Sequence, residues 1–364
     1  MPEFYTNPPL FLAILFVLAG FWVLIKGAGI LVEGAVALAT RQGMQHAVIG
    51  ATIVAFGTSL PELVVTMGSN IKAMNEGLIG DPNGPAAIAI GNVVGSNIFN
   101  IGMILGIASL FSALPVPKST LKLDYPLMLL AMVVLIIFSI PFAGGVGEIS
   151  RVEGSILVVG LVLFTVMAIK GGKVDEDELE ELARHEHSLW GAVGFIALGV
   201  VMLTVGGEVS LTGAIATAKT FGMSDRVIGL TIMAIGTSLP ELVTSIQAAR
   251  RGHTEIAIGN VVGSNIFNVL CIIGLTSLVF PMPIAEGTLA WDYYWMMGMA
   301  LALLPMLLIG KCVGRVKGLI LVTAMVTYLV LVVVLDQSTD GDAEVVSGVA
   351  AVSPVSPSSE TEIR

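Results

Sequence analysis

Charge is the first thing that this sequence has little of. Only 12% of its 364 residues are Asp, Glu, Lys or Arg, about half of the roughly 25% that is usual in soluble domains. Hydrophobic residues make up 55% of the chain, and apolar runs of about 18 residues or more recur along its length, which is typical of transmembrane helices. These features exclude a soluble globular protein and predict an all-α polytopic membrane protein.

Cysteine and basic targeting residues are scarce as well. The two cysteines, Cys271 and Cys312, lie in or beside apolar runs, which excludes a disulfide framework and favours small apolar core residues. The N-terminal ten residues contain no Lys or Arg, so we expect the first apolar run to be a retained span and not a cleaved signal. The net charge of −10 lies mainly in one loop and the tail. Nothing here indicates a nucleic-acid partner, a cofactor or a protein partner.

The apolar runs predict ten membrane-spanning helices of about 20 residues each. They lie near residues 10–32, 47–71, 86–112, 125–142, 153–170, 190–217, 226–248, 254–280, 290–310 and 317–336. One acidic polar segment separates the first five spans from the second five. We therefore expect a first five-helix repeat at 1–170, an acidic linker at 171–189, a second five-helix repeat at 190–336 and a disordered tail at 337–364.

The basic residues predict the orientation of the chain, because Lys and Arg collect on the cytoplasmic side of membrane proteins. With the central loop inside, four Lys or Arg face outward, namely Lys72, Arg151, Lys219 and Arg226. Eleven face inward, namely Arg41, Lys118, Lys122, Lys170, Lys173, Arg184, Arg250, Arg251, Lys311, Arg315 and Lys317. We therefore expect a multi-pass protein of the cell (inner) membrane, with a cytoplasmic central loop and both termini outside.

Two stretches of the first half return in the second half. The motif GTSLPEL at 57–63 recurs at 236–242, an offset of 179, and IAIGNVVGSNIFN at 88–100 recurs letter for letter at 256–268, an offset of 168. Because each half holds an odd number of spans, equivalent helices cross the membrane in opposite directions. Inverted repeats of this kind build alternating-access transporters, with the binding site near the midplane.

Each copy of the first motif places a glutamate, Glu62 or Glu241, inside a span. A carboxylate at the bilayer centre costs at least ~2.5 kcal/mol, and no Lys or Arg occupies equivalent embedded positions in both halves, since Lys26 aligns with Val205. Bound cations would supply the missing positive charge. The alternative is that both glutamates are protonated and hydrogen-bonded.

The residues before each glutamate supply further oxygen ligands. Pro61 and Pro240 have no N–H, so the carbonyl four residues earlier in each helix loses its usual donor. Carboxylate, carbonyl and hydroxyl oxygens suit Ca²⁺, and Na⁺ would accept the same hard ligands. The hydroxyl groups one turn before the glutamates belong to Thr58, Ser59, Thr237 and Ser238.

The second motif adds polar groups on one face of a helix. Ser96 and Asn100 are four residues apart, as are Ser264 and Asn268, so each pair shares a face. Asn92 and Asn260 continue these faces one turn earlier. Glycines spaced four apart in the same stretch allow close helix packing. A phosphate-binding loop is not indicated, because the glycine-rich stretch is not followed by the lysine that such loops require.

The paired motifs GTSLPEL and GNVVGSNIFN resemble the two alpha-repeats of the cation/Ca²⁺ exchanger superfamily, and most closely its sodium/calcium exchanger branch. The resemblance covers the ten-span core. It implies four clustered cation sites, one favouring Ca²⁺ and the others Na⁺, with both ions as transported substrates. The implied ligands are Glu62, Thr58, Ser59, Ser96, Asn100 and the Ala55 carbonyl, together with Glu241, Thr237, Ser238, Ser264, Asn268 and the Ala234 carbonyl.

Asn268 departs from part of the family, because potassium-dependent members and some prokaryotic exchangers carry Asp at this position. Two formal negative charges instead of three argue against potassium dependence. The central loop is also too short for the calcium-sensing domains of animal exchangers. We therefore do not expect calcium regulation through such domains.

Three functions fit these motifs to different degrees. The favoured hypothesis is a secondary antiporter that exchanges Na⁺ for Ca²⁺ and carries out no enzymatic reaction. A Ca²⁺/H⁺ exchanger that uses Glu62 and Glu241 is the first alternative, and a passive channel is the second. Glu208 and Glu33 lie in spans that resemble the mobile helices of the family, but Glu208 aligns with Gly29, and Glu33 with Thr212. Neither acid is duplicated, so snorkelling to the interface is the preferred interpretation.

Overall fold

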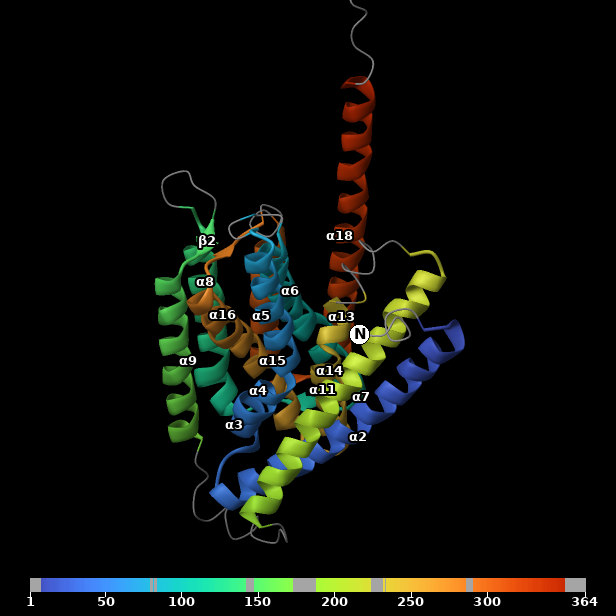
Figure 1. Cartoon of the computed structure of the whole chain (residues 1–364). Helices are drawn as coiled ribbons and strands as arrows, with labels where there is room; N and C mark the ends of the chain where they lie inside the picture. The colour runs from blue at the N-terminus through green and yellow to red at the C-terminus, as the bar shows by residue number, and fades with distance from the viewer. Residues whose placement is uncertain are drawn as a thin grey trace, which may run out of the picture. The chain divides into compact units, whose positions relative to one another are not determined.

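The computed structural model describes residues 8–78, 81, 84–141, 147–172, 188–223, 232, 234–285 and 291–350, and these residues are predominantly helical (Figure 1). The first half begins with α2 (Leu10–Gln42). A broken span follows, built from α3 (His46–Ile49), the π-helix η1 (Gly50–Val54), α4 (Ala55–Thr58) and α5 (Leu60–Asn75). The remaining elements of this half are α6 (Pro85–Phe99), η2 (Asn100–Ile104), α7 (Leu105–Phe111), η3 (Thr120–Asp124), α8 (Tyr125–Ser139) and α9 (Arg151–Gly171).

The second half repeats this order. It begins with α11 (Leu189–Thr220) and continues with α13 (Ala234–Thr237) and α14 (Leu239–Arg250), which match α4 and α5. The elements that complete it are α15 (Thr254–Phe267), η5 (Asn268–Ile273), α16 (Gly274–Val279), α17 (Tyr293–Leu308) and α18 (Arg315–Ala350). The predicted linker falls almost wholly on residues 173–187, which lie outside the described residues, as does the start of the predicted span 226–248.

Two small sheets tie the halves together. Strand β1 (Leu114–Pro115) pairs with β4 (Cys312–Val313), and β2 (Glu148–Ile149) pairs with β3 (Met282–Pro283), both antiparallel. Each sheet therefore joins a loop of one half to a loop of the other. The strands β1 and β3 also lie at equivalent positions of the repeat, 168 residues apart.

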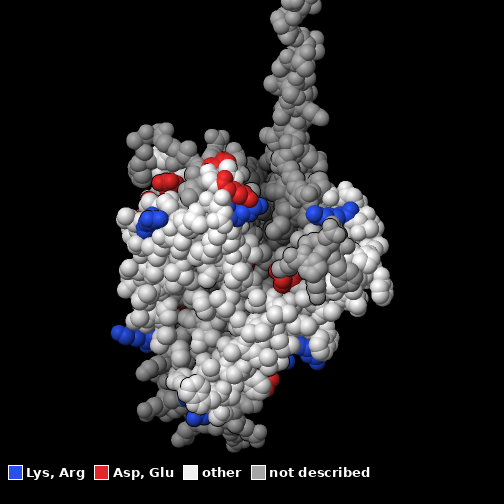
Figure 2. All heavy atoms as spheres, viewed as in Figure 1, with Lys and Arg blue, Asp and Glu red and all other residues white. Residues whose placement is uncertain are grey.

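The helices provide the predicted membrane spans. Within the described chain, seven helices are long and apolar enough to cross a bilayer, and an eighth span forms if the helices on either side of the 42° bend between Thr58 and Leu60 are counted together. The shorter apolar α17 and the partly described span that contains α13 and α14 occupy the two remaining predicted positions. On the face in Figure 2, charged side chains lie mostly toward the two ends, with a broad uncharged band between them. Such a surface suits lipid.

The ends of some helices differ from the sequence-based boundaries. The first span was expected to end near residue 32, but α2 continues to Gln42, where Gly43 at φ 59° provides a left-handed C-cap. Helix α18 continues to Ala350, into the segment predicted as a disordered tail, and residues 351–364 lie outside the described residues. The contacts between residues divide the chain into two compact units, Met1–Met325 and Val326–Arg364. The predicted division into repeats, linker and tail stays a prediction.

The interior of the first unit is organised around α15. Every residue from Ile256 to Phe267 is buried, so this helix has no lipid-facing side. It packs against η1, α3, α4 and α14. Close approach depends on glycine: a Cβ placed on Gly263 would come within 2.4 Å of the Ala51 carbonyl oxygen. Helices α2 and α11 pack closely against each other (Figure 1).

Candidate ion-binding site

The two GTSLPEL motifs each interrupt a helix at the serine before the Leu-Pro-Glu sequence. Ser59 separates α4 from α5 with φ −85° and ψ 4°, and Ser238 separates α13 from α14 with φ −91° and ψ 8°. Each proline then lies in the first turn of the new helix, where a missing N–H is tolerated. Glu62 and Glu241 also lie in these first turns, so each carboxylate is close to the positive end of a helix dipole.

Each buried glutamate is held by the serine of the other repeat. Glu62 and Glu241 are both 1% exposed. Ser59 Oγ donates to Glu241 Oε1 at 2.8 Å, and Ser238 Oγ donates to Glu62 Oε1 at 3.3 Å. These reciprocal bonds bring the two motifs together, although the bonded residues are 182 and 176 positions apart in the sequence. The second oxygen of each carboxylate, Oε2, has no hydrogen-bond partner among the described residues.

The second motif brings its serine and asparagine oxygens into the same buried region. Ser238 Oγ, which contacts Glu62, also lies 3.2 Å from Ser96 Oγ. Asn100 and Asn268 are each 1% exposed and each begins a π-helical turn, η2 or η5, a feature that is common at functional sites. Their Oδ1 atoms and the Oγ of buried Ser264 have no partner within the described part of the protein.

The threonines and backbone carbonyls of the predicted set are placed around the helix breaks. Thr58 is fully buried, and its Oγ1 lies 3.2 Å both from the Ala55 carbonyl oxygen, to which it donates, and from Asn260 Oδ1. Thr237 is 5% exposed. Ala234 is the first residue of α13, and its side-chain surroundings lie outside the description. Whether these atoms bind an ion remains a prediction.

The site is made of neutral and acidic oxygens. No Lys or Arg among the described residues forms an ion pair with Glu62 or Glu241. The described residues contain no group of three or more His, Cys, Asp or Glu that could hold a metal. Carboxylate, hydroxyl and amide oxygens are the ligands that hard cations such as Ca²⁺ prefer.

Asn97 is a residue of this region that the sequence reasoning missed. Its Oδ1 accepts a 3.0 Å hydrogen bond from Asn268 Nδ2, and its own Nδ2 lies 3.8 Å from Met296 Sδ on α17. This contact turns the carbonyl end of Asn268 away from Asn97 and leaves its oxygen unpaired. Asn97 directly follows Ser96, so helical periodicity placed it on another face. Only its position within the duplicated block could have indicated a role.

Asn92 and Asn260, the asparagines predicted to extend the polar faces, differ in their hydrogen-bond partners. Asn260 Nδ2 donates to Ser245 Oγ at 3.0 Å and to the Glu241 carbonyl at 3.4 Å. The equivalent Asn92 has a buried Nδ2 without a partner in the described chain. Two identical sequence blocks therefore have different surroundings.

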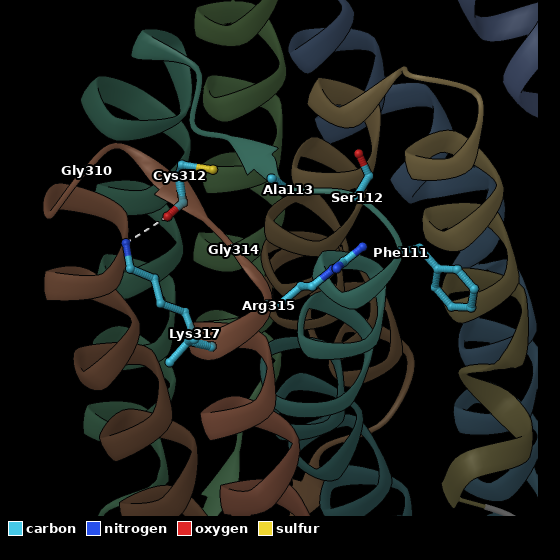
Figure 3. Close-up of a pocket in the computed structure, with 9 residues that line it drawn as sticks. Phe111, Ser112, Ala113, Gly310, Cys312, Gly314, Arg315 and Lys317 are labelled. Carbon is cyan, nitrogen blue, oxygen red and sulfur yellow. Dashed lines mark hydrogen bonds between the residues drawn. The ribbon is translucent and has the colours of Figure 1, made fainter.

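One cavity of the described residues lies outside this cluster. A cavity of about 580 Å³ is found where the end of α7 meets the start of α18 (Figure 3). Lys317 lines it, but Lys317 Nζ donates to the Cys312 and Met306 carbonyls at 2.7 Å each and thereby caps the end of α17. None of the predicted ion ligands lines this cavity. The ion-binding prediction thus concerns a buried cluster, not a surface pocket.

Comparison with known proteins agrees with this architecture. The family described as sodium/calcium exchanger protein matches residues 12–170 and 191–334. The protein CaxA of Alkalimonas amylolytica is 35% identical over 87% of this chain and 97% of its own. The sodium/calcium exchanger MaX1 of Methanosarcina acetivorans is 30% identical, with the same two coverages.

Solved structures give the same result. Structures of the sodium-calcium exchanger NCX_Mj, soaked with Na⁺ and Sr²⁺ or without Na⁺ and Ca²⁺, match with TM-scores of 0.73 and 0.74 at 27% identity. They cover 88% and 89% of this chain and 99% and 100% of their own. The predicted fold of ten transmembrane helices in two inverted five-helix repeats is thereby confirmed. The chain belongs to the sodium/calcium exchanger protein family.

Proposed function

We propose that this cation/Ca²⁺ exchanger couples the inward movement of Na⁺ to the export of Ca²⁺, and that both ions use one site between the repeats. The observation that carries the proposal is the reciprocal pair of bonds from Ser59 to Glu241 and from Ser238 to Glu62. They join two buried carboxylates from oppositely oriented motifs into one cluster. Each carboxylate keeps an oxygen that the described protein leaves unused.

Charge balance explains why the two ions would compete. Two carboxylates carry two negative charges, which one Ca²⁺ or a set of Na⁺ ions can neutralise. Without a cation both charges stay uncompensated at a depth where charge is expensive. Only a loaded site should therefore pass through the occluded state, and this requirement converts binding into obligatory exchange.

The proposed ligands supply enough oxygens for a dehydrated ion. Ca²⁺ takes about six to eight oxygen ligands, and the cluster offers carboxylate, hydroxyl, amide and carbonyl oxygens from both repeats. The unpaired atoms Glu62 Oε2, Glu241 Oε2 and Ser264 Oγ, together with the amide oxygens of Asn100 and Asn268, are the ones that bind without breaking an existing hydrogen bond. The proposed site is completed by Thr58, Ser59, Ser96, Thr237, Ser238 and the carbonyls of Ala55 and Ala234.

We further propose that the central loop is cytoplasmic and that both termini are outside, in the cell membrane. The excess of Lys and Arg on that side supports the orientation. A single cysteine introduced at Lys219, near the predicted outer end of α11, tests it in sealed cells when Cys271 and Cys312 have first been removed. Labelling by a membrane-impermeant maleimide agrees with the proposal, whereas labelling only after permeabilisation would reverse the orientation.

The coupling ion is tested by flux measurements on purified protein in proteoliposomes. Vesicles loaded with Na⁺ and diluted into Na⁺-free medium that contains ⁴⁵Ca²⁺ should accumulate the label, and vesicles with equal Na⁺ on both sides should not. A parallel series replaces the Na⁺ gradient by a pH gradient. Uptake that follows the pH gradient and ignores Na⁺ would establish the Ca²⁺/H⁺ alternative, and conductance far above carrier rates would establish a channel.

Site variants connect the flux to the cluster. Glu62→Gln keeps the size of the side chain but removes one charge, so it should abolish Na⁺-driven Ca²⁺ uptake in a protein that still folds. Glu148→Gln is a matched control, because Glu148 is exposed in the short strand β2. Substantial exchange by Glu62→Gln would show that the site lies elsewhere.

A further inference from the structure

Helices α2 and α11 pack as a pair but contact the two repeats unequally. They lie side by side (Figure 1) and approach closely at glycines: a Cβ on Gly199 would lie 2.7 Å from the Leu31 nitrogen, and a Cβ on Gly213 would lie 2.5 Å from the Ala13 carbonyl oxygen. Helix α2 also packs extensively on α14, whereas the equivalent pair, α11 and α5, makes almost no contact. The structure therefore packs α2 on α14 without the equivalent packing of α11 on α5.

A cationic side chain secures this one-sided arrangement. Arg251, which ends α14, donates from Nη1 to the Gly29 carbonyl of α2 at 2.7 Å. The missing side chain of Gly29 makes room for the guanidinium, because a Cβ there would lie 2.5 Å from Arg251 Nη2. The contact therefore joins the α2–α11 pair to the end of α14.

The repeat gives this contact an equivalent in the other half. At the offset of 179 that relates Glu62 to Glu241, Arg251 corresponds to Lys72 and Gly29 corresponds to Glu208. Both halves thus have a basic residue near the end of the equivalent helix, Lys72 in α5 and Arg251 after α14. The residue equivalent to Gly29 of α2, which offers only its backbone carbonyl, is Glu208 of α11, which has a carboxylate. Glu208 and Lys72 carry opposite charges and are suited to form an ion pair.

The two partners of this equivalent contact are apart in the present structure. Lys72 Nζ lies 3.9 Å from Glu76, and both side chains are largely exposed, at 64% and 46%. Glu208 is exposed and makes no hydrogen bond or ion pair with any residue that the structure describes. A carboxylate within a span is costly without a partner, so Glu208 is expected to gain one in another state.

We propose that Lys72 and Glu208 form an ion pair in the opposite state of the transport cycle and that this pair alternates with the contact between Arg251 and Gly29. Inverted repeats reach their second state when the two halves exchange their packing. In that state α11 packs on α5 and α2 leaves α14, so Lys72 gains Glu208 while Arg251 loses Gly29. The proposal rests on alternating access, as the proposed function does, but not on the identity of the coupling ion.

Cross-linking first tests whether residues 72 and 208 come close together. Lys72→Cys and Glu208→Cys are combined in a chain from which Cys271 and Cys312 have been removed and which still transports. Oxidation should link the pair under one of the two ion conditions, Na⁺ or Ca²⁺ alone, and should arrest flux until a reductant is added. Lys72→Cys with Val201→Cys is the control, since Val201 is also exposed but lies about 10 Å further along α11.

A double-mutant cycle tests whether Lys72 and Glu208 are energetically coupled. Lys72→Gln and Glu208→Gln should each slow exchange by about two- to fivefold, the range expected for a partly exposed ion pair. The double variant should be no slower than the slower single variant, and the charge exchange Lys72→Glu with Glu208→Lys should recover the rate. Independent, multiplicative losses, or a Cys pair that fails to link under either ion condition, overturn the proposal.

The wild-type flux separates the two proposals. If the wild-type protein shows no Na⁺-driven Ca²⁺ uptake, the proposed function fails, whatever the cross-linking shows. If the wild-type protein exchanges normally while the Lys72 and Glu208 variants behave independently and do not cross-link, only the proposed ion pair between Lys72 and Glu208 is wrong. Loss of the Arg251 contact through Arg251→Gln should favour the Lys72–Glu208 state and increase the yield of the cross-link.

Discussion

The identical glycines Gly95 and Gly263 should respond in opposite ways to the same substitution. Both belong to the duplicated block GNVVGSNIFN. A Cβ on Gly263 would lie 2.4 Å from the Ala51 carbonyl oxygen and 2.6 Å from its Cα, whereas a Cβ on Gly95 would meet no heavy atom of the described residues within 4 Å. Gly263→Ala should therefore be destabilising and Gly95→Ala should be close to neutral.

The structure sets the size of the effect. The atoms that a Cβ on Gly263 would meet are backbone atoms of η1, so no rotamer change can relieve the overlap. A separation of about 1 Å between α15 and η1 is needed to restore ordinary contact near 3.5 Å. Because α15 is buried on all sides, this shift disturbs every neighbour. The cost should lie at the upper end of overpacking penalties, about 3 kcal/mol.

Thermal denaturation of both variants in the same detergent and without transported ions tests this reasoning. A loss of about 3 kcal/mol lowers the melting temperature of a domain of 150–250 residues by roughly 6 °C or somewhat more. The melting temperature of a larger chain should fall by less for the same loss of free energy. Gly95→Ala supplies the matched control for the loss of glycine flexibility. Equal melting temperatures for the two variants would refute the packing of α15 on η1 as described.

Three further predictions concern the polar cluster. Ca²⁺ at about 100 times its dissociation constant should stabilise the wild-type protein by about 2.7 kcal/mol, and Glu62→Gln should lose this shift in a thermal titration; an undiminished shift would contradict the role of Glu62. Asn260→Leu leaves Ser245 and the Glu241 carbonyl unpaired, so it should cost about 1–3 kcal/mol in denaturation experiments, and more than Asn92→Leu. Asn268→Asp adds a third charge and should make Ca²⁺ flux respond to K⁺, while a flux that ignores K⁺ would count against the charge argument.

Much of the fold could be predicted from the sequence because membranes impose simple rules. A helix must bury its backbone polar groups within itself, and about 20 apolar residues are needed to cross the bilayer. Ten such segments and a duplicated motif therefore predicted the ten-span, inverted-repeat architecture. Helix ends were less accurate: the left-handed cap at Gly43 places the end of α2 ten residues beyond the predicted boundary, because the length needed to cross a bilayer does not fix where a longer helix ends.

The candidate site could be predicted as a set of residues but not as a set of contacts. The motif identified Glu62, Glu241 and their serine neighbours. It could not indicate that each serine would bond to the glutamate of the other repeat, since this depends on how two distant helix breaks meet. Asn97 was missed for the same reason, because its partner Asn268 lies 171 residues away.

The sequence by itself determined what the two halves share: the spans, the broken helices and a pair of acids in opposite orientations. The tertiary structure alone decided how the halves differ. Identical letters repeat identical local physics, so Gly95 and Gly263, or Asn92 and Asn260, were equivalent in sequence. Packing then gave one member of each pair a close neighbour or a hydrogen-bond partner that the other lacks among the described residues. This inequality arises because each copy packs against different neighbours: Gly263 lies against η1, and Asn260 bonds to Ser245 of α14.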